Sequence, residues 1–465
     1  MKKIGYYTAT GGELILISNG FNNFLKRYNN LEIQARSKRD LRDLGKFSNF
    51  LDYIKTVDML IISLHGGKES CPGFDELISS VSNNTKIFIY PSSASDLDIA
   101  LEYSNLEEEI WKKLYGYFSY SGVDNYYNML IYLNNILSHT NYEFEEPKPL
   151  PWEGIYHPDY IQPPTLDEYL EKKYDKTKPT IGIWFHRSQW VNQNTDYMDR
   201  LIQEIENRGA NVLALFCNSI KDDEIGNLGA KGVTEEYFTK NNETLIDVLI
   251  NMMMFSSTMM DKENEFMFHK LGVPVIKGIL SFNNKEDWEK SFQGLDPIDI
   301  SINIAMPEFD GNLITVPIAF NNMTLIDPLT GAKITRYIVE EERVEKIVNL
   351  SLNWAKLKYI PNSEKKVAII FHNYPPKNHS IGTAFGLDSP TSVINILREM
   401  DKRGYSIEKI PGDGDELIGE IINRATNDRN FISNKELYKR AIDTVELEDY
   451  TNGINKLSNK VKEDM

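Results

Sequence analysis

The hydrophobic residues of this chain gather into short, nearly continuous runs that alternate with helix-like segments. Short apolar runs rich in β-branched side chains are typical of strands covered on both faces. Segments in which apolar residues recur every three or four positions follow several of them, which predicts strand–helix–strand units and parallel sheets. The predicted strands are 1–7, 57–64, 86–90, 180–185, 211–216, 273–276 and 366–371, and the predicted helices are 125–137, 165–174, 197–205, 341–357 and 389–400.

These elements predict an α/β protein with several Rossmann-like or flavodoxin-like parallel-sheet domains in one chain. Residues 1–140 are expected to form an N-terminal α/β domain and residues 180–362 a central one. Prolines interrupt both helix interiors and central strands, and they are dense between these domains, so 141–179 is predicted to be a linker with one short helix. Residues 363–465 are predicted to form a third α/β unit that looks truncated.

The composition of the chain indicates which classes of partner and which cellular location to expect. Of 465 residues, 51 are basic and 68 acidic, which gives a formal net charge of −17. Because a strongly negative surface repels phosphate and anionic lipid, we expect no nucleic acid and no membrane among the partners. Two cysteines and the lack of a long apolar run predict a cytoplasmic protein without disulfides or membrane spans. No P-loop sequence occurs, so we do not expect this chain to bind ATP in that way.

Two polar clusters flank the start of the central domain. In Gly154–Asp159, a proline stiffens a turn that carries His157, although an ordinary exposed proline turn is the alternative. After the strand at 180–185 come His186 and Arg187, and Asn194 precedes a helix. An arginine together with helix-start amides can hold a carboxylate. A capped helix with an arginine on its rim is the alternative.

A pair of carboxylates occurs in Pro307-Glu308-Phe309-Asp310-Gly311. We expect an extended backbone here, which would point Glu308 and Asp310 to the same side. Paired carboxylates can take protons from a weakly acidic nitrogen or hold a hard divalent cation. A surface turn between strands is the alternative.

Two further clusters follow the predicted strand at 366–371. His372 and His379 could ligate a metal, but their spacing fits no standard helical pair, and hydrogen-bonded loop histidines are the preferred interpretation. Gly386 and Asp388 lie in a glycine loop at a predicted helix start, where the backbone can approach a flat or anionic ligand.

Five methionines form a soft apolar cluster, for which core filling is the preferred interpretation and contact with a large conjugated ring the alternative. They are Met252, Met253, Met254, Met259 and Met260.

The residue sequences of these clusters, and their order along the chain, resemble those of one protein family. The chain is similar to the N-terminal portion of the large, porphyrin- or corrin-binding subunit of the class I metal chelatases, which includes the cobaltochelatase large subunit and the magnesium chelatase H subunit. The similarity is carried, in the same order, by Gly154–Asp159, Phe185–Arg187 with Asn194-Thr195, Gly272–Ile276, Pro307–Gly311, Pro361–Ala368, Asn373–Asn378 and Gly386–Pro390.

The resemblance implies that the chain takes part in inserting Co²⁺ or Mg²⁺, as substrate, into a corrin or porphyrin ring. It also implies that ATP is hydrolysed on separate AAA+ and von Willebrand-type partner subunits. On this basis Glu308 is the leading catalytic and metal-binding candidate, with Asp310 and His372 as further catalytic candidates. The implied substrate-binding residues are His157, His186, Arg187, Asn194, Gly386 and Asp388.

Members of this family are much longer than this chain. A split subunit, a fragment and a degenerate paralogue are therefore all open, and a separate C-terminal half of the large subunit is an expected partner. Two other functions also stay open. One is a non-catalytic tetrapyrrole carrier or adaptor that keeps the scaffold, and the other is a small-anion or nucleotide-sugar binder on generic α/β domains.

Overall fold

The computed structural model describes residues 1–223, 225–265, 267–424, 426–430 and 432–465. These residues divide into two compact units, Met1–Lys356 and Leu357–Met465, called unit 1 and unit 2. The predicted fold class is confirmed, because unit 1 contains two sheets whose central strands run parallel. Among the described residues, none of the helices combines the length and apolar character needed to cross a membrane.

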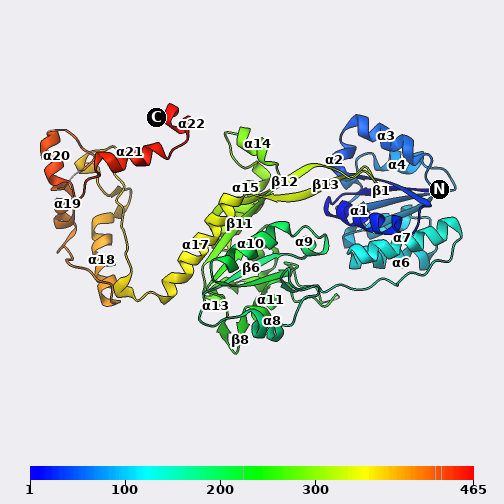
Figure 1. Ribbon diagram of the computed structural model, residues 1–465, viewed down its shortest axis with the longest axis horizontal. Coiled ribbons are helices and arrows are strands. Elements are labelled where there is room, and N and C mark those ends of the chain that lie inside the picture. Colours follow the sequence, from blue (N-terminus) through cyan, green and yellow to red (C-terminus); the bar gives the residue numbers. More distant parts are fainter. Residues whose placement is uncertain (224, 266, 425, 431) are drawn as a thin grey trace. The chain divides into compact units, whose positions relative to one another are not determined.

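The first sheet of unit 1 has four parallel strands in the order β2–β1–β3–β4. All six side chains of β3 are buried, as expected for a strand covered on both faces. The strands are β1 (Lys2–Thr8), β2 (Leu31–Ser37), β3 (Met59–Leu64) and β4 (Lys86–Pro91). One face packs on α1 (Gly12–Leu25), α6 (Glu108–Tyr120) and α7 (Val123–Ser138), and the other on α2 (Lys38–Leu41), α3 (Leu44–Ile54), α4 (Phe74–Ser80) and α5 (Leu97–Tyr103) (Figure 1).

The second sheet has seven strands in the order β13–β12–β11–β10–β6–β7–β5. Its five inner strands run parallel, and both edge strands run antiparallel to their neighbours. The strands are β5 (Gly154–Tyr156), β6 (Thr180–His186), β7 (Asn211–Cys217), β10 (Val248–Asn251), β11 (Val275–Ser281), β12 (Leu313–Ile326) and β13 (Lys333–Val339). Strand β5 lies inside the segment that the sequence predicts to be a linker.

Helices cover both faces of this second sheet (Figure 1). One face packs on α10 (Asp196–Asn207) and α17 (Glu341–Tyr359). The other packs on α8 (Leu166–Lys173), α11 (Gly229–Tyr237) and α13 (Met267–Leu271). The remaining short elements of unit 1 are α9 (Arg187–Val191), β8 (Thr239–Lys240), β9 (Glu243–Thr244), α12 (Ser257–Met260), α14 (Lys285–Lys290), α15 (Pro297–Ile300) and α16 (Met306–Phe309).

The winding of the second sheet leaves a crevice at one edge. From β6 the chain continues to β7 on one side and later returns to β10 on the other side. The loops that leave the carboxyl ends of β6 and β10 therefore diverge. In open α/β sheets, ligands bind at such switch points.

The long hairpin of β12 and β13 is an element that the sequence analysis does not predict. Its tip packs on the first sheet, where the Ala35 amide donates to the Thr330 carbonyl oxygen at 3.0 Å and Ser18 Oγ donates to Asp327 Oδ2 at 2.8 Å. Ala332, in the same turn, belongs to the buried core beneath α1. The hairpin therefore joins the two sheets into one unit.

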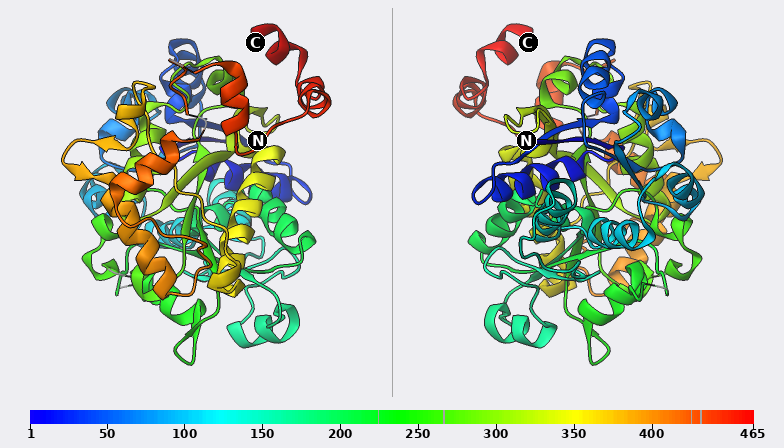
Figure 2. Two further views of the ribbon diagram at one scale, coloured as in Figure 1. Left: turned by 90° about the vertical axis from the view of Figure 1, so that its left-hand side faces the viewer. Right: turned by 90° about the vertical axis from the view of Figure 1, so that its right-hand side faces the viewer.

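Unit 2 is mainly helical, with α18 (Ser389–Lys402), α19 (Gly414–Ile422), α20 (Asn434–Arg440), α21 (Leu447–Asn455) and α22 (Asn459–Asp464). Strands β14 (Thr383–Ala384) and β15 (Leu387–Asp388) form a small hairpin, drawn as short orange arrows in Figure 2. The helix predicted after Asp388 is confirmed. The strand predicted at 366–371 is wrong, because within the described part of unit 2 no neighbouring strand pairs with it.

Candidate functional site

A cavity of about 760 Å³ lies at the carboxyl edge of the second sheet. Its walls come from four adjacent strands: His186 ends β6, Ser219 follows β7, Met252 follows β10 and Leu280 lies in β11. This is the crevice at the switch point between β6 and β10. Its volume falls within the range of about 300–1,000 Å³ that is typical of small-molecule sites.

Long apolar side chains form much of the wall, including Met252, Met254, Phe255 and Leu280. Phe255 has a φ of +65°, in the left-handed region that a bulky residue seldom adopts. Its amide donates to the Ile302 carbonyl oxygen at 2.8 Å, which helps to hold this conformation. Because the backbone is held in a costly conformation next to a cavity, the loop after β10 is a candidate ligand-binding segment.

Asp310 fixes the same loop from outside the cavity. Its Oδ1 accepts hydrogen bonds from Ser256 Oγ at 2.7 Å and the Thr258 amide at 3.3 Å, and its Oδ2 accepts from the Ser257 amide at 2.6 Å. Hydrogen bonds to a carboxylate are among the stronger ones in proteins. Asp310 is therefore a positioning residue for the loop that carries Phe255, which differs from the catalytic role predicted from the sequence.

The extended backbone expected around Glu308 is wrong. Residues Met306–Phe309 form helix α16, with Pro307 in its first turn, where the fixed φ of proline suits a helix. Gly311, at φ +74°, ends it. Side chains two positions apart on a helix lie about 200° apart, so Glu308 and Asp310 do not share a side. Glu308 is exposed and is not among the residues that line the cavity.

His186 is the predicted site residue that lines this cavity. The Ser188 amide donates to its Nδ1 at 3.2 Å, so the neutral ring carries its proton on Nε2. Crowding by protein atoms, together with the neighbouring Arg187 charge, lowers the pKa of His186 to about 4. Its side chain still has access to solvent, which limits the size of this shift. His186 thus offers an Nε2–H donor to a ligand.

We expect the His186 ring to stay neutral between pH 6 and pH 8, because both the crowding by protein atoms and the Arg187 charge oppose its protonation. Two-dimensional ¹H–¹⁵N NMR of the histidine rings should show an Nε2–H tautomer that does not titrate in this range. The His186→Gln variant assigns the signal by its disappearance. A ring that gains its proton near the ordinary pKa of about 6.5 would contradict the geometry.

Arg187 does not face the cavity as predicted. It is buried, its Nε donates to the Pro151 carbonyl oxygen at 2.7 Å and its Nη2 to that of Leu150 at 3.3 Å. Its guanidinium lies 4.2 Å from the centre of the Trp152 ring. Burial lowers the pKa of Arg187 to about 10. Because its donors are used on the segment before β5, Arg187 anchors that segment and is poorly placed to clamp a ligand.

His157 and Asn194 are also engaged within the fold. His157 is buried, with its Nε2 3.1 Å from Glu206 Oε1, and its Nδ1 accepts from the Asp159 amide at 3.2 Å. Asn194 is buried, and its Oδ1 accepts from the Tyr337 amide at 3.3 Å. Both residues therefore have structural partners in place of the predicted ligand.

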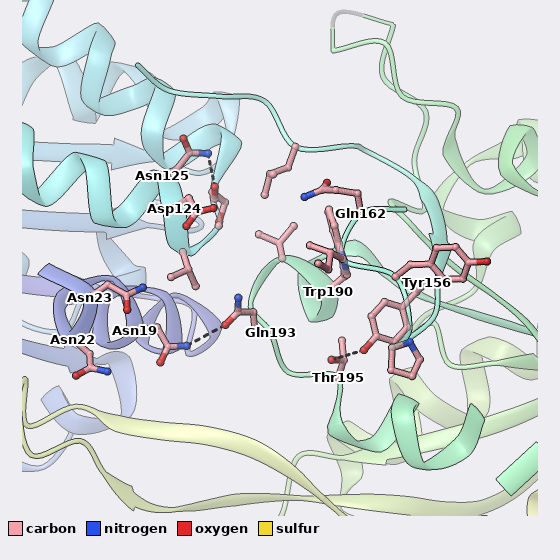
Figure 3. Close-up of a pocket in the computed structure, with 18 residues that line it drawn as sticks. Asn19, Asn22, Asn23, Asp124, Asn125, Tyr156, Gln162, Trp190, Gln193 and Thr195 are labelled. Carbon is pink, nitrogen blue, oxygen red and sulfur yellow. Dashed lines mark hydrogen bonds between the residues drawn. The ribbon is translucent and has the colours of Figure 1, made fainter. Parts of the chain in front are cut away.

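A second cavity, of about 610 Å³, is lined by sequence neighbours of these two residues, among them Tyr156 and Thr195 (Figure 3). Its lining is rich in amide side chains from α1, the start of α7 and the loop after α9, and Asn19 Nδ2 donates to Gln193 Oε1 across it at 3.3 Å. Trp190 and Tyr156 lie on the facing wall. Because this lining is more polar, the first cavity is the better candidate for an apolar ring.

The other predicted site residues belong to unit 2. His372 is exposed, and its ring centre lies 6.4 Å from that of Tyr374. Gly386 lies in the turn of the β14–β15 hairpin at φ +75°. Asp388 is the N-cap of α18, where its Oδ1 accepts from the Thr391 amide at 3.0 Å, and this bond lowers the pKa of Asp388.

Two polar atoms on residues that line the first cavity lack partners among the described residues. They are the Tyr197 hydroxyl and Gln189 Oε1, and both are shielded from solvent. Buried polar groups are nearly always hydrogen-bonded in folded proteins. Such groups at the wall of a cavity fit a site that a ligand completes. No group of three or more acidic, histidine or cysteine side chains that could hold a metal ion occurs in the described ranges.

The methionine cluster divides between core and cavity. Met252 and Met253 are both buried in the core, which confirms core filling for these two residues. Met252 also lines the cavity, together with Met254. Met259 is exposed, and the side chain of Met260 lies outside what the structure describes. The methionines come directly after a short buried strand, and this position was the sequence signal that they could form a wall of a cavity at the switch point.

The fold and the cavity define a doubly wound α/β protein with a ligand site at its switch point. Comparison with known proteins is more specific. The CobN/Magnesium Chelatase family matches residues 115–465, and the chain belongs to this family.

Several relatives are much longer than this chain. It is 39% identical, over its whole length, to an uncharacterised Methanocaldococcus jannaschii protein, of which it covers 38%. It is 26% identical to the aerobic cobaltochelatase subunit CobN of Pseudomonas aeruginosa over 81% of this chain and 29% of that protein. The fold resembles the catalytic subunit of cobaltochelatase from Mycobacterium tuberculosis, with a TM-score of 0.60 and 23% identity over 90% of this chain and 33% of that one.

Proposed function

We propose that this chain is the tetrapyrrole-binding part of a metal chelatase large subunit, which inserts Co²⁺ or Mg²⁺ into a corrin or porphyrin ring. The observation that carries the proposal is the cavity at the β6/β10 switch point, which has methionine and phenylalanine walls in a member of the CobN/Magnesium Chelatase family. Flat conjugated rings pack well on soft, polarisable side chains. Binding of a tetrapyrrole to the full chain, followed by its absorption spectrum, tests this proposal.

The polar groups in and around the cavity have different roles in binding the ring. His186 supplies an Nε2–H donor for a carboxylate or carbonyl on the ring periphery. The Tyr197 hydroxyl and Gln189 Oε1 lack partners among the described residues but are shielded from solvent, so a ligand reaches them only if the cavity wall shifts. Asp310 holds the wall loop in place through Ser256, Ser257 and Thr258. These groups bind and orient the ring.

Metal insertion also requires that two pyrrolic nitrogens lose their protons and that the metal loses water. We propose Glu308 as the group that accepts a proton or holds the incoming cation. Support comes from the segment Pro307–Gly311, which carries part of the resemblance to the chelatase family to which this chain belongs. Glu308 itself is exposed to solvent, so a hydrated metal ion can reach it.

Replacing Glu308 with glutamine should lower the rate of metal insertion by about 10²–10⁴-fold while leaving ring affinity unchanged, because Glu308 acts on protons and lies outside the cavity lining. The rate is measured in an assembly reconstituted with the rest of the large subunit and with AAA+ and von Willebrand-type subunits. Ring affinity is measured separately by absorption titration of the same variant.

Glu342→Gln is the matched control, since Glu342 is an exposed carboxylate on α17. It should change neither quantity. An unchanged insertion rate in the Glu308 variant would remove Glu308 from the mechanism. Ring binding without any insertion by the wild-type assembly would favour the carrier function.

We further propose that ATP is used by those partner subunits and that the metal is bound only as substrate. Relatives of this chain are named as subunits, and this chain covers about a third of the cobaltochelatase catalytic subunit. The rest of the large subunit is therefore a proposed partner in the complete reaction.

A further inference from the structure

Unit 2 buries very little apolar surface. Of its described residues, 357–424, 426–430 and 432–465, only Ile381 and Ile394 are buried hydrophobic side chains. Unit 1, by contrast, holds four buried clusters, and every member of these clusters belongs to unit 1. Domains of about 100 residues normally bury well over half of the surface exposed in the unfolded chain, which offsets the entropy lost on folding. Unit 2 therefore lacks a core that would stabilise it.

Segment 366–371 is an apolar stretch of unit 2 whose side chains are exposed and whose backbone groups are unpaired within the described residues. Val367, Ile369 and Ile370 are 57%, 40% and 90% exposed, and Ala368 is exposed as well. No backbone hydrogen bond within the described residues involves this segment. Its sequence is nonetheless a continuous apolar run rich in β-branched residues, a pattern typical of a strand covered on both faces of a parallel sheet.

The carboxyl end of this segment is already held. The Gly382 amide donates to the His372 carbonyl oxygen at 2.8 Å, and Asn373 forms a β-bridge with Ile381. The Phe371 ring packs against Gly382, where a Cβ would lie 2.6 Å from it. Within the described residues the backbone amides and carbonyls of the segment itself are thus left unpaired. Exposed strands of this kind readily pair with another chain.

We propose that residues 366–371 form a docking strand, which adds to a β-sheet in the part of the large subunit that lies outside the match between this chain and its longer relatives. The relatives indicate the occupant, because this chain covers 38% of the M. jannaschii protein, 29% of P. aeruginosa CobN and 33% of the M. tuberculosis subunit. In such strand addition, backbone hydrogen bonds supply affinity and alternate side chains fill pockets on the two faces.

This inference rests on family membership and the exposure of the segment. It does not depend on the proposed binding of a tetrapyrrole, so either proposal can fail without the other. A ring titration reports on the cavity of unit 1, whereas the experiment below reports on the backbone amides of unit 2.

Hydrogen–deuterium exchange on the full chain tests the proposal directly. The probe is the part of the M. jannaschii relative outside its match with this chain, produced as a separate polypeptide. Alone and dilute, the amides of residues 366–371 should exchange nearly as fast as in an unfolded peptide. With the probe in excess, their exchange should slow by at least about 100-fold, as in a paired strand.

Three variants separate strand pairing from other contacts. In an extended strand successive amides point to opposite edges, so either Ala368→Pro or Ile369→Pro must remove an amide on the paired edge. We expect at least one of them, and Ile370→Asp, to weaken probe binding at least about 50-fold. Phe292→Asp is the matched control, since Phe292 is a fully exposed apolar residue of unit 1, and it should bind the probe normally.

Several results would overturn the proposal. Protection of 366–371 in the dilute chain alone would show that the chain covers this segment itself. Protection that rises with the concentration of the chain, without the probe, would assign the segment to a second copy. Failure of the probe to bind, or binding that all three variants leave unchanged, would exclude the docking strand.

Discussion

Replacing Met254 with aspartate should reduce the affinity of the chain for a tetrapyrrole by at least about 100-fold. Met254 is half-buried and lines the cavity beside Phe255. A bound ring would remove the new carboxylate from water and face it with an apolar surface, and burying an unpaired charge costs several kcal/mol. Because each 1.4 kcal/mol changes an equilibrium tenfold, a loss of two orders of magnitude is the minimum expected. Absorption titration at fixed ionic strength measures it.

The matched control is Met259→Asp, which makes the same change five residues further along. Met259 is 62% exposed on α12 and is not among the cavity residues. Its variant should bind the ring as the wild type does. Equal losses in both variants would point to disturbance of the whole loop, and no loss in either would place the ring elsewhere.

Replacing Lys277 with methionine should remove a pH dependence from the stability of unit 1. Lys277 is fully buried in β11, where its Nζ donates to the Met253 carbonyl oxygen at 2.5 Å. Burial lowers the pKa of Lys277 to about 7, against about 10.4 for an unfolded lysine. Between these values the unfolded state binds more protons at this residue, so Lys277 alone adds about 3 kcal/mol to stability from pH 7 to pH 10. Buried groups such as Tyr156, Cys71 and Cys217, whose pKa values burial raises, act in the opposite direction over the same range.

Denaturant unfolding followed by tryptophan fluorescence measures this difference, because Trp184 belongs to the same buried cluster as Met253. The Lys277→Met variant should have a higher free energy of unfolding than the wild type at pH 7, and this difference should shrink by about 3 kcal/mol by pH 10, because the contributions of the other groups cancel in the comparison. Lys346→Met, at an exposed lysine on α17, is the control, and its difference from the wild type should not change with pH. A difference between Lys277→Met and the wild type that does not change with pH would mean that Lys277 is charged in the folded protein.

The parallel strands of unit 1 could be predicted because their residues are buried on both faces, which leaves a continuous apolar run as a signal. Strands at 59–64, 180–186 and 211–217 are of this kind. The β12–β13 hairpin was missed because its strands are less apolar, although Asp327, Pro328 and Gly331 mark a turn between two β-branched runs. Residues 366–371 carry the same apolar signal, but no strand among the described residues pairs with them, so a local pattern alone could not predict their structure.

The sequence could predict that polar residues gather after the strands, but it could not predict which partners their side chains contact. A sequence places polar residues after strands, and His186 lies where that rule predicts. It does not say which partner a side chain finds, so Arg187 turns to backbone carbonyl oxygens and His157 to Glu206. The prediction that Glu308 and Asp310 point to the same side was wrong, because Pro307 suits a helical turn as well as an extended segment. The cavity depends on the winding of the sheet, which local patterns do not specify.

The central claim is that the cavity between the carboxyl ends of β6 and β10 holds a tetrapyrrole. The most direct measurement is an absorption titration of a porphyrin or corrin precursor with the wild-type chain and the Met254→Asp variant. The account predicts a saturable shift of the main absorption band with the wild type and its loss in the variant. No shift with any tetrapyrrole, or a shift of equal affinity in both proteins, would contradict it.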